Sequence, residues 1–184
     1  MRLLLATVAL AATALVAPVS AQQPAADLKN TVFLETKDGR IAIHLRPDLA
    51  PRHVEQIKTL TKRGFYNGVP FHRVIEGFMA QTGDPTGTGT GKSDLPNIPA
   101  EFTKTPFKVG TVGMARSASP DSANSQFFIC YEGCGPLTGQ YTVVGEVVSG
   151  MDVAQKIKKG DRNANGMVQS PDRIVRMQLA EDAR

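Results

Sequence analysis

The sequence of 184 residues has no tryptophan, two cysteines and an aromatic content of only 6%. Two cysteines are too few for a scaffold held by many disulfides. Neither sign of charge dominates locally, because the formal net charge of +4 is spread along the chain, so we predict no nucleic-acid-binding surface. With 41% hydrophobic and 21% charged residues, the composition is that of a globular protein. At about 150 residues per domain, the length predicts one domain with a sizeable core.

A hydrophobic run long enough to cross a membrane is also missing. The apolar stretch 3–17 is shorter than the roughly 18 residues that span a bilayer. Arg2 precedes this stretch, Pro18 ends it, and residues 19–21 (VSA) match the small-residue rule for cleavage. This pattern predicts a signal peptide and an exported protein whose mature form is not attached to a membrane.

The predicted organisation is a signal peptide (1–21), a flexible polar leader (22–29) and one folded domain (30–181). We expect the mature protein in the periplasm. The same signal also serves release outside the cell, and the sequence leaves that choice open.

Most of the domain has the pattern of short β-strands separated by turns. The strands are expected at 31–36, 41–45, 69–75, 77–81, 109–115, 125–131, 141–148 and 174–179. Apolar residues at helical spacing, namely Val54, Ile57 and Leu60, predict an amphipathic helix that stops at Gly64. A second, shorter helix is predicted over residues 151–159. Many short strands with two separated helices favour a mainly β fold, a closed barrel or a sandwich, over a parallel α/β sheet.

Two motifs resemble known sites but fit them poorly. Residues 87–93 (GTGTGKS) suggest a phosphate-binding P-loop, but Thr86 stands where the template needs its first glycine. The prolines at 96 and 99 also prevent the helix that such a loop must open, so a flexible surface loop is predicted instead. A catalytic triad of Ser122, His72 and Asp121 has no nucleophile-elbow motif to support it.

Residues 161–172 partly match a calcium-binding loop, with Asp161 and Asp172 as the charged ligands. Because the segment leads into Pro171 and a strand rather than a helix, an Asn/Gly-rich connection is the preferred interpretation. No metal site is predicted.

The sequence leaves open whether Cys130 and Cys134 form a disulfide. They are too far apart to bond if the strand runs straight. A turn at the glycines between and after them would permit the bond.

Three long segments closely resemble the cyclophilin family of peptidyl-prolyl isomerases. They are 71–91 (FHRVIEGFMAQTGDPTGTGTG), 113–129 (GMARSASPDSANSQFFI) and 136–157 (PLTGQYTVVGEVVSGMDVAQKI). The resemblance spans about 31–179 and implies a closed eight-stranded antiparallel β-barrel capped by two α-helices. It also implies an active groove on the outside of the barrel and no cofactor.

Carried over residue by residue, the resemblance places the family's catalytic arginine at Arg73. The remaining matches are substrate-binding: Phe78, Met79, Phe128 and Leu137 in the proline pocket, Gln81 and Gln126 on the substrate backbone, and Ala115 and Tyr141 at the groove wall and rim. Strand alternation independently puts Gln126 and Phe128 on one face of their strand and Phe127 on the other, in the core.

Two residues and one loop depart from the family pattern. Pro136 stands where many cyclophilins carry a tryptophan that lines the inhibitor site, so we predict weak cyclosporin binding. Tyr141 replaces a histidine common at the groove rim, as in bacterial members, so activity is expected to survive. The loop 116–124 looks one residue longer than in animal relatives.

Two functions follow from the sequence. The first is catalysis of cis-trans isomerisation at X-Pro bonds of unfolded or partly folded exported polypeptides, by a protein expected to be a monomer. The second is a non-catalytic chaperone that binds proline-containing segments, and the intact Arg73 favours the first.

Overall fold

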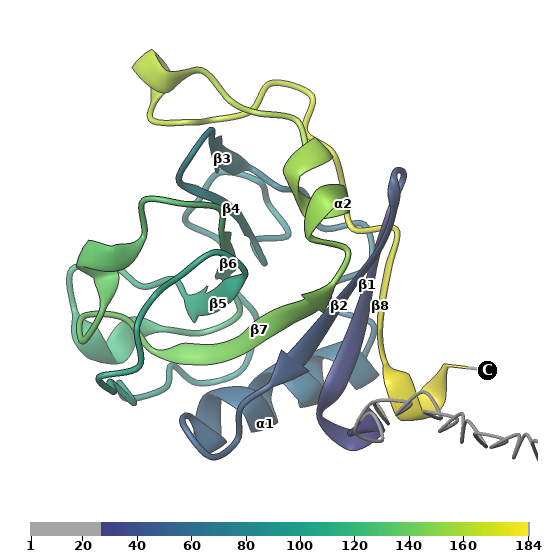
Figure 1. Cartoon of the computed structure of the whole chain (residues 1–184), viewed down its shortest axis with the longest axis vertical. Coiled ribbons are helices and arrows are strands. Elements are labelled where there is room, and N and C mark those ends of the chain that lie inside the picture. The colour runs from purple at the N-terminus through teal and green to yellow at the C-terminus, as the bar shows by residue number, and fades with distance from the viewer. Residues whose placement is uncertain (1–26, 184) are drawn as a thin grey trace, which may run out of the picture.

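The structure, a computed structural model, describes residues 27–183, which form eight β-strands and two α-helices (Figure 1). The strands are β1 (Thr31–Thr36), β2 (Gly39–Leu45), β3 (Arg73–Ile75), β4 (Met79–Thr82), β5 (Thr111–Met114), β6 (Phe127–Cys130), β7 (Val143–Ser149) and β8 (Arg176–Leu179). The helices are α1 (Pro51–Lys62) and α2 (Met151–Lys156). No helix of this part of the chain has the length and apolarity to cross a membrane.

The predicted signal peptide lies outside the described residues, as do the first residues of the predicted leader. The last leader residues are ordered, because they belong to the 3-10 helix η1 (Leu28–Asn30). The Asp27 side chain caps this turn by accepting a hydrogen bond from the Asn30 amide.

The strands form one antiparallel sheet in the order β3-β4-β6-β5-β7-β2-β1-β8. The sheet curves strongly but is open, so the prediction of a closed barrel was wrong (Figure 1). Between its two edges, segments 68–72 and 168–174 are joined by separate hydrogen bonds, such as Phe71 N to Asp172 O at 2.9 Å. A continuous ladder cannot form there because Pro70 and Pro171 lack an N–H.

The main core is enclosed by the sheet and both helices. α1 contributes Val54, Ile57 and Leu60, all at most 2% exposed, as their helical spacing predicts. Figure 1 shows the two helices at opposite ends of the curved sheet. On β6, Phe127 lies in this core whereas Phe128 belongs to a second cluster, which confirms the predicted alternation.

A carboxylate distant in sequence caps the N-terminus of α1. Ala50 is the N-cap residue and has no side chain able to accept a hydrogen bond. The Glu101 carboxylate accepts instead from the amides of Arg52 at 3.2 Å and His53 at 3.1 Å. The same carboxylate lies 2.6 Å from His53 Nδ1. Glu101 thereby satisfies two of the free N–H groups of the first turn.

Several elements are shorter than predicted. α2 ends at Lys156 rather than continuing to residue 159, because the backbone angles of Ile157 are already non-helical. The strand expected over 69–75 is regular only in β3, since Pro70 interrupts its donors. The predicted hairpin between β1 and β2 is present, but its turn residues are Lys37 and Asp38 rather than Asp38 and Gly39, because Thr36 pairs with Gly39, which has φ 134°.

Candidate active site

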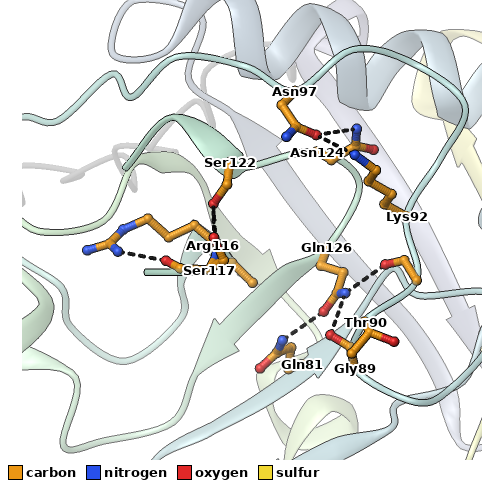
Figure 2. A pocket seen from close by; sticks show the side chains of 12 residues that line it. Gln81, Gly89, Thr90, Lys92, Asn97, Arg116, Ser117, Ser122, Asn124 and Gln126 are labelled. Carbon is orange, nitrogen blue, oxygen red and sulfur yellow. Dashed lines mark hydrogen bonds between the residues drawn. The ribbon is translucent and has the colours of Figure 1, made fainter. Parts of the chain in front are cut away.

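Two adjoining cavities lie along β3, β4, β5 and β6. The smaller, about 180 Å³, is lined by Arg73, Phe78, Met79, Gln81, Ala115, Arg116, Phe128, Leu137 and Tyr141. The larger, about 400 Å³, is lined by Gln81, Ala115, Arg116 and Gln126 together with residues of the loops 89–97 and 117–124 (Figure 2). All nine residues singled out in the sequence therefore border one of two cavities that share Gln81, Ala115 and Arg116.

Strand register places the key side chains in one row. Arg73 on β3 pairs with Gln81 on β4, and Gln81 pairs with Phe128 on β6. Phe128 in turn pairs with Gly113 on β5. Directly opposite residues project from the same face of a sheet, so a guanidinium, an amide and an aromatic ring stand side by side.

The floor of the smaller cavity is apolar and rigidly packed. Met79 is 2% and Phe128 4% exposed. Phe107 stacks on the Phe128 ring with centroids 5.8 Å apart, and Tyr141 meets it edge-on, also at 5.8 Å. Such contacts fix the position of the Phe128 ring and shape a small apolar recess at the floor of the cavity.

Three hydrogen bonds hold the Arg73 side chain. Nε donates to the carbonyl oxygen of Asn165 at 2.9 Å, and Nη2 donates to its Oδ1 at 3.0 Å. Nη1 donates to Gln81 Oε1 at 3.2 Å. Of the five N–H donors of a guanidinium, two remain for a bound molecule. Burial lowers the pKa of Arg73, yet an arginine stays charged at neutral pH.

Sequence reasoning missed two neighbours of the row. Asn165 lies 92 positions from Arg73 and follows the 3-10 helix η4 (Arg162–Ala164), with φ 53°. It belongs to the segment considered as a calcium loop, and only its Asn-Gly turn signal was visible in the sequence. Phe107, which supports Phe128, lies in a segment without periodicity that gave no signal at all.

A chain of side-chain amides leads away from Arg73 toward a loop. Gln81 Nε2 donates to Gln126 Oε1 at 2.9 Å. Gln126 Nε2 donates to the carbonyl oxygens of Gly89 at 3.0 Å and Gly91 at 2.8 Å. Figure 2 shows the two glutamine side chains pointing toward each other at the base of the larger cavity. Both amides are therefore already engaged within the protein.

The two cavities carry positive charge. Arg73, Lys92 and Arg116 are among their lining residues, and none of the described residues that line them is acidic. The Arg116 guanidinium lies 4.6 Å from the centre of the Tyr141 ring and donates to the Gln140 carbonyl at 3.0 Å. These contacts keep Arg116 at the boundary between the two cavities.

Cys130 and Cys134 form a disulfide, with Cα atoms 6.1 Å apart. Gly133, at φ 30°, turns the chain back after β6, which was one of the two alternatives the sequence left open. Cys134 immediately precedes the 3-10 helix η3 (Gly135–Leu137), which brings Leu137 to the smaller cavity. Pro136 is exposed and lines neither cavity.

The other motifs hold ordinary structural contacts. His72 is 1% exposed, whereas Ser122 bonds to Ser117 and to the Ser119 carbonyl on the surface loop, so they form no triad. In the segment 161–172, Asp161 caps η4 by accepting from Asn163 N, and Asp172 accepts from Lys158 N.

Comparison with known proteins agrees with this geometry. A family model described as cyclophilin type peptidyl-prolyl cis-trans isomerase/CLD matches residues 31–179. The chain is 56% identical over 190 residues to a probable peptidyl-prolyl cis-trans isomerase of Brucella suis, with 96% of this chain and 97% of the relative covered. It is 40% identical over 136 residues to peptidyl-prolyl cis-trans isomerase B of Bacillus subtilis, with 73% and 94% covered.

Solved structures show the same fold. A cyclophilin of Hirschia baltica superposes with a TM-score of 0.75 at 29% identity, covering 86% of this chain and 76% of that chain. A cyclophilin-type isomerase of Cryptosporidium parvum, crystallised in the presence of the dipeptide Ala-Pro, gives a TM-score of 0.73 at 25% identity, with 81% and 98% covered.

Proposed function

The chain belongs to the cyclophilin-type peptidyl-prolyl cis-trans isomerases, and on this premise we propose that Arg73 is the residue that catalyses X-Pro isomerisation in it. The observation that carries the proposal is the row formed by Arg73, Gln81 and Phe128. It places a fixed guanidinium with two free donors beside an apolar site of about 180 Å³.

The chemistry needs no cofactor. Rotation about the X-Pro bond meets a barrier of about 18–20 kcal/mol because it breaks amide resonance. In the twisted transition state the proline nitrogen regains a lone pair. A donor aimed at that nitrogen forms a hydrogen bond that strengthens only as the amide twists, so it stabilises the transition state more than the substrate. Arg73 supplies such a donor without transferring a proton.

The apolar cavity binds the proline ring in this mechanism. Phe78, Met79, Phe128 and Leu137 surround the proline ring and hold it while the preceding carbonyl turns. A less polar environment also disfavours the planar, more polar amide relative to the twisted one. Gln81, Gln126, Ala115 and Tyr141 border the path of the substrate backbone.

The substrates in this proposal are unfolded or partly folded exported polypeptides. Support comes from the N-terminal sequence, in which Arg2, an apolar stretch and VSA at 19–21 form a signal-peptide pattern. Uncatalysed isomerisation takes about 10–100 s and limits folding, and catalysis without ATP suits the periplasm. Mass spectrometry of the protein from a periplasmic fraction should find Gln22 as its first residue; an intact N-terminus in a cytoplasmic fraction would contradict export.

The deciding experiment measures cis-to-trans conversion of a short X-Pro peptide by the wild type and by Arg73→Ala. We expect a loss of about 10²–10³-fold in kcat/KM, the range for losing one donor to a transition state. Arg40→Ala is the matched control, because Arg40 pairs with Glu35 on the distant β1–β2 hairpin. Undiminished turnover in folded Arg73→Ala contradicts the proposal, and no acceleration by the wild type favours a chaperone that only binds proline segments.

A further inference from the structure

The loop 84–91 is wrapped around the carboxylate of Asp84, which is 0% exposed. Oδ1 accepts from the Thr86 amide at 2.7 Å, and Oδ2 accepts from the amides of Gly89 at 2.7 Å and Gly91 at 3.0 Å. The Thr86 hydroxyl donates to Oδ1 as well, at 2.7 Å. The shape of this loop is therefore set by a buried acceptor at its centre.

The site requires an ionised carboxylate. Burial by itself would raise the pKa of Asp84, but the hydrogen bonds from Thr86, Gly91 and Gly89 outweigh burial and hold that pKa below its usual range. A carboxylate accepts on both oxygens, whereas an amide would turn an NH₂ group toward N–H donors. A Cβ at position 91 would collide with Asp84 Oδ1, so any larger residue there would displace the carboxylate.

The loop presents two carbonyl oxygens to the row of site residues. Because Gly89 O and Gly91 O only accept, the Gln126 group that faces both must be its NH₂. Gln126 Oε1 then faces Gln81 and accepts from Nε2. Gln81 is thus left with its own oxygen toward Arg73 Nη1. The orientation of each amide follows from the one before it, starting at the loop.

We propose that Asp84 is a positioning residue for the isomerisation, which fixes the carbonyls of Gly89 and Gly91 and thereby sets the donor-to-acceptor direction of the chain Gln126–Gln81–Arg73. The inference rests on the proposed role of Arg73. Without the carboxylate the loop carbonyls lose their position, and the Gln126 amide is free to turn over. The NH₂ group of Gln81 then faces the guanidinium, and because both groups are donors, no hydrogen bond forms between them. Arg73 loses one of its three hydrogen bonds.

The test is a double-mutant cycle that combines Asp84→Asn with Gln126→Ala. In the peptide assay, Asp84→Asn should lower kcat about tenfold with little change in KM, because the guanidinium geometry matters most in the transition state. In the Gln126→Ala background, Asp84→Asn should lower kcat no further, although it still lowers the melting temperature. The wild type in the same assay shows whether the protein is an isomerase at all. The variants then test only whether Asp84 acts through the chain Gln126–Gln81–Arg73.

Thr86→Val provides a second route if Asp84→Asn does not fold. Thr86 is exposed, and the substitution removes one hydroxyl donor to Asp84 while leaving the carboxylate in place. We expect Thr86→Val to lower kcat by less than Asp84→Asn does. If Thr86→Val lowers kcat no further in the Gln126→Ala background, the result supports the positioning role of Asp84. Thr36→Val is the matched control, since that hydroxyl holds the turn of the distant β1–β2 hairpin, and its kcat should be that of the wild type. Multiplicative losses in the cycle, or an unchanged kcat in a folded Asp84 or Thr86 variant, overturn the proposal.

Discussion

At the scale of single residues, the contacts of Arg73 require the shape of an arginine side chain as well as its positive charge. The Arg73 side chain uses one edge on the carbonyl and amide of Asn165 and another on Gln81, and it still lines the cavity. A lysine ammonium is a point charge with three donors on a flexible stem and has no planar fork to make these contacts together.

Arg73→Lys is therefore predicted to lose nearly as much activity as Arg73→Ala. We expect kcat/KM to fall about 10²-fold or more, because a misplaced donor no longer meets the proline nitrogen in the transition state. The melting temperature should change little, since the side chain is partly exposed. Recovery of near-wild-type turnover in Arg73→Lys would mean that charge, not geometry, is what the site needs.

Gly113 keeps the floor of the smaller cavity in place. A Cβ at this position would lie 2.5 Å from Phe128 Cζ and 2.7 Å from Phe107 Cε1, so both stacked rings would have to move. Gly113→Ala should lower the free energy of unfolding by about 1–3 kcal/mol, as overpacking does, and raise KM because Phe128 enters the cavity. Gly135→Ala is the matched control, because a Cβ there has nothing within 4 Å. Equal KM values for the two variants would argue against this role of Gly113.

At the scale of elements, a short bridged segment carries Leu137 to the cavity. The Cys130–Cys134 disulfide joins β6 to the start of η3. Closing a loop of five residues stabilises the folded state by about 2 kcal/mol in the chain-entropy model. Replacing both cysteines by serine should lower the free energy of unfolding by about that amount and raise KM, because Leu137 is held less firmly.

Chemical reduction distinguishes this effect from side-chain changes. A reductant should lower the melting temperature of the wild type toward that of the double serine variant and leave the variant itself unchanged. If the reductant does not alter the wild type, the bridge contributes nothing to stability in solution.

How far the sequence predicts these elements depends on how local their causes are. The alternation that separates Phe127 from Phe128 and the helical spacing on α1 are local, and the structure has both. The contact of Arg73 with Asn165 and that of His53 with Glu101 join residues 92 and 48 positions apart, so no local pattern predicts them. The open sheet depends on Pro70 meeting the segment near Pro171, a pairing that is visible only after folding.

At the scale of the whole molecule, the two adjoining cavities form one groove whose charged lining residues are all positive. Arg73, Lys92 and Arg116 line it without an acidic partner among the described residues there. Peptides with a glutamate near the proline should therefore have a kcat/KM up to about fivefold higher than lysine counterparts, as expected for partly exposed ion pairs. The preference should shrink with added salt and in Lys92→Ala. A preference for lysine peptides would show that these cations do not face the substrate.

The stability of the whole fold should fall in mild acid, because it buries two histidines. His53 and His72 are at most 1% exposed, and burial lowers the pKa of both, against the opposing effect of Glu101 on His53 and of Asp84 on His72. Since the Glu101 carboxylate only accepts, His53 Nδ1 is the donor, and Nε2 is the buried, unpartnered nitrogen that a second proton would occupy. The unfolded chain binds that proton near pH 6.5, whereas the folded protein resists it.

The sign of the pH dependence follows from these lowered pKa values. Stability is fully present above about pH 6.5 and is lost as the pH falls, by up to about 1.4 kcal/mol per pH unit for each histidine. The lowered pKa values of Glu101 and Asp84 extend the loss in the same direction below about pH 4.5. Urea unfolding between pH 7.5 and 5.0 should show this slope, and His53→Gln should reduce it. A free energy of unfolding that stays constant over this range would mean that the folded protein accepts both protons, and that the burial of these rings does not resist ionisation.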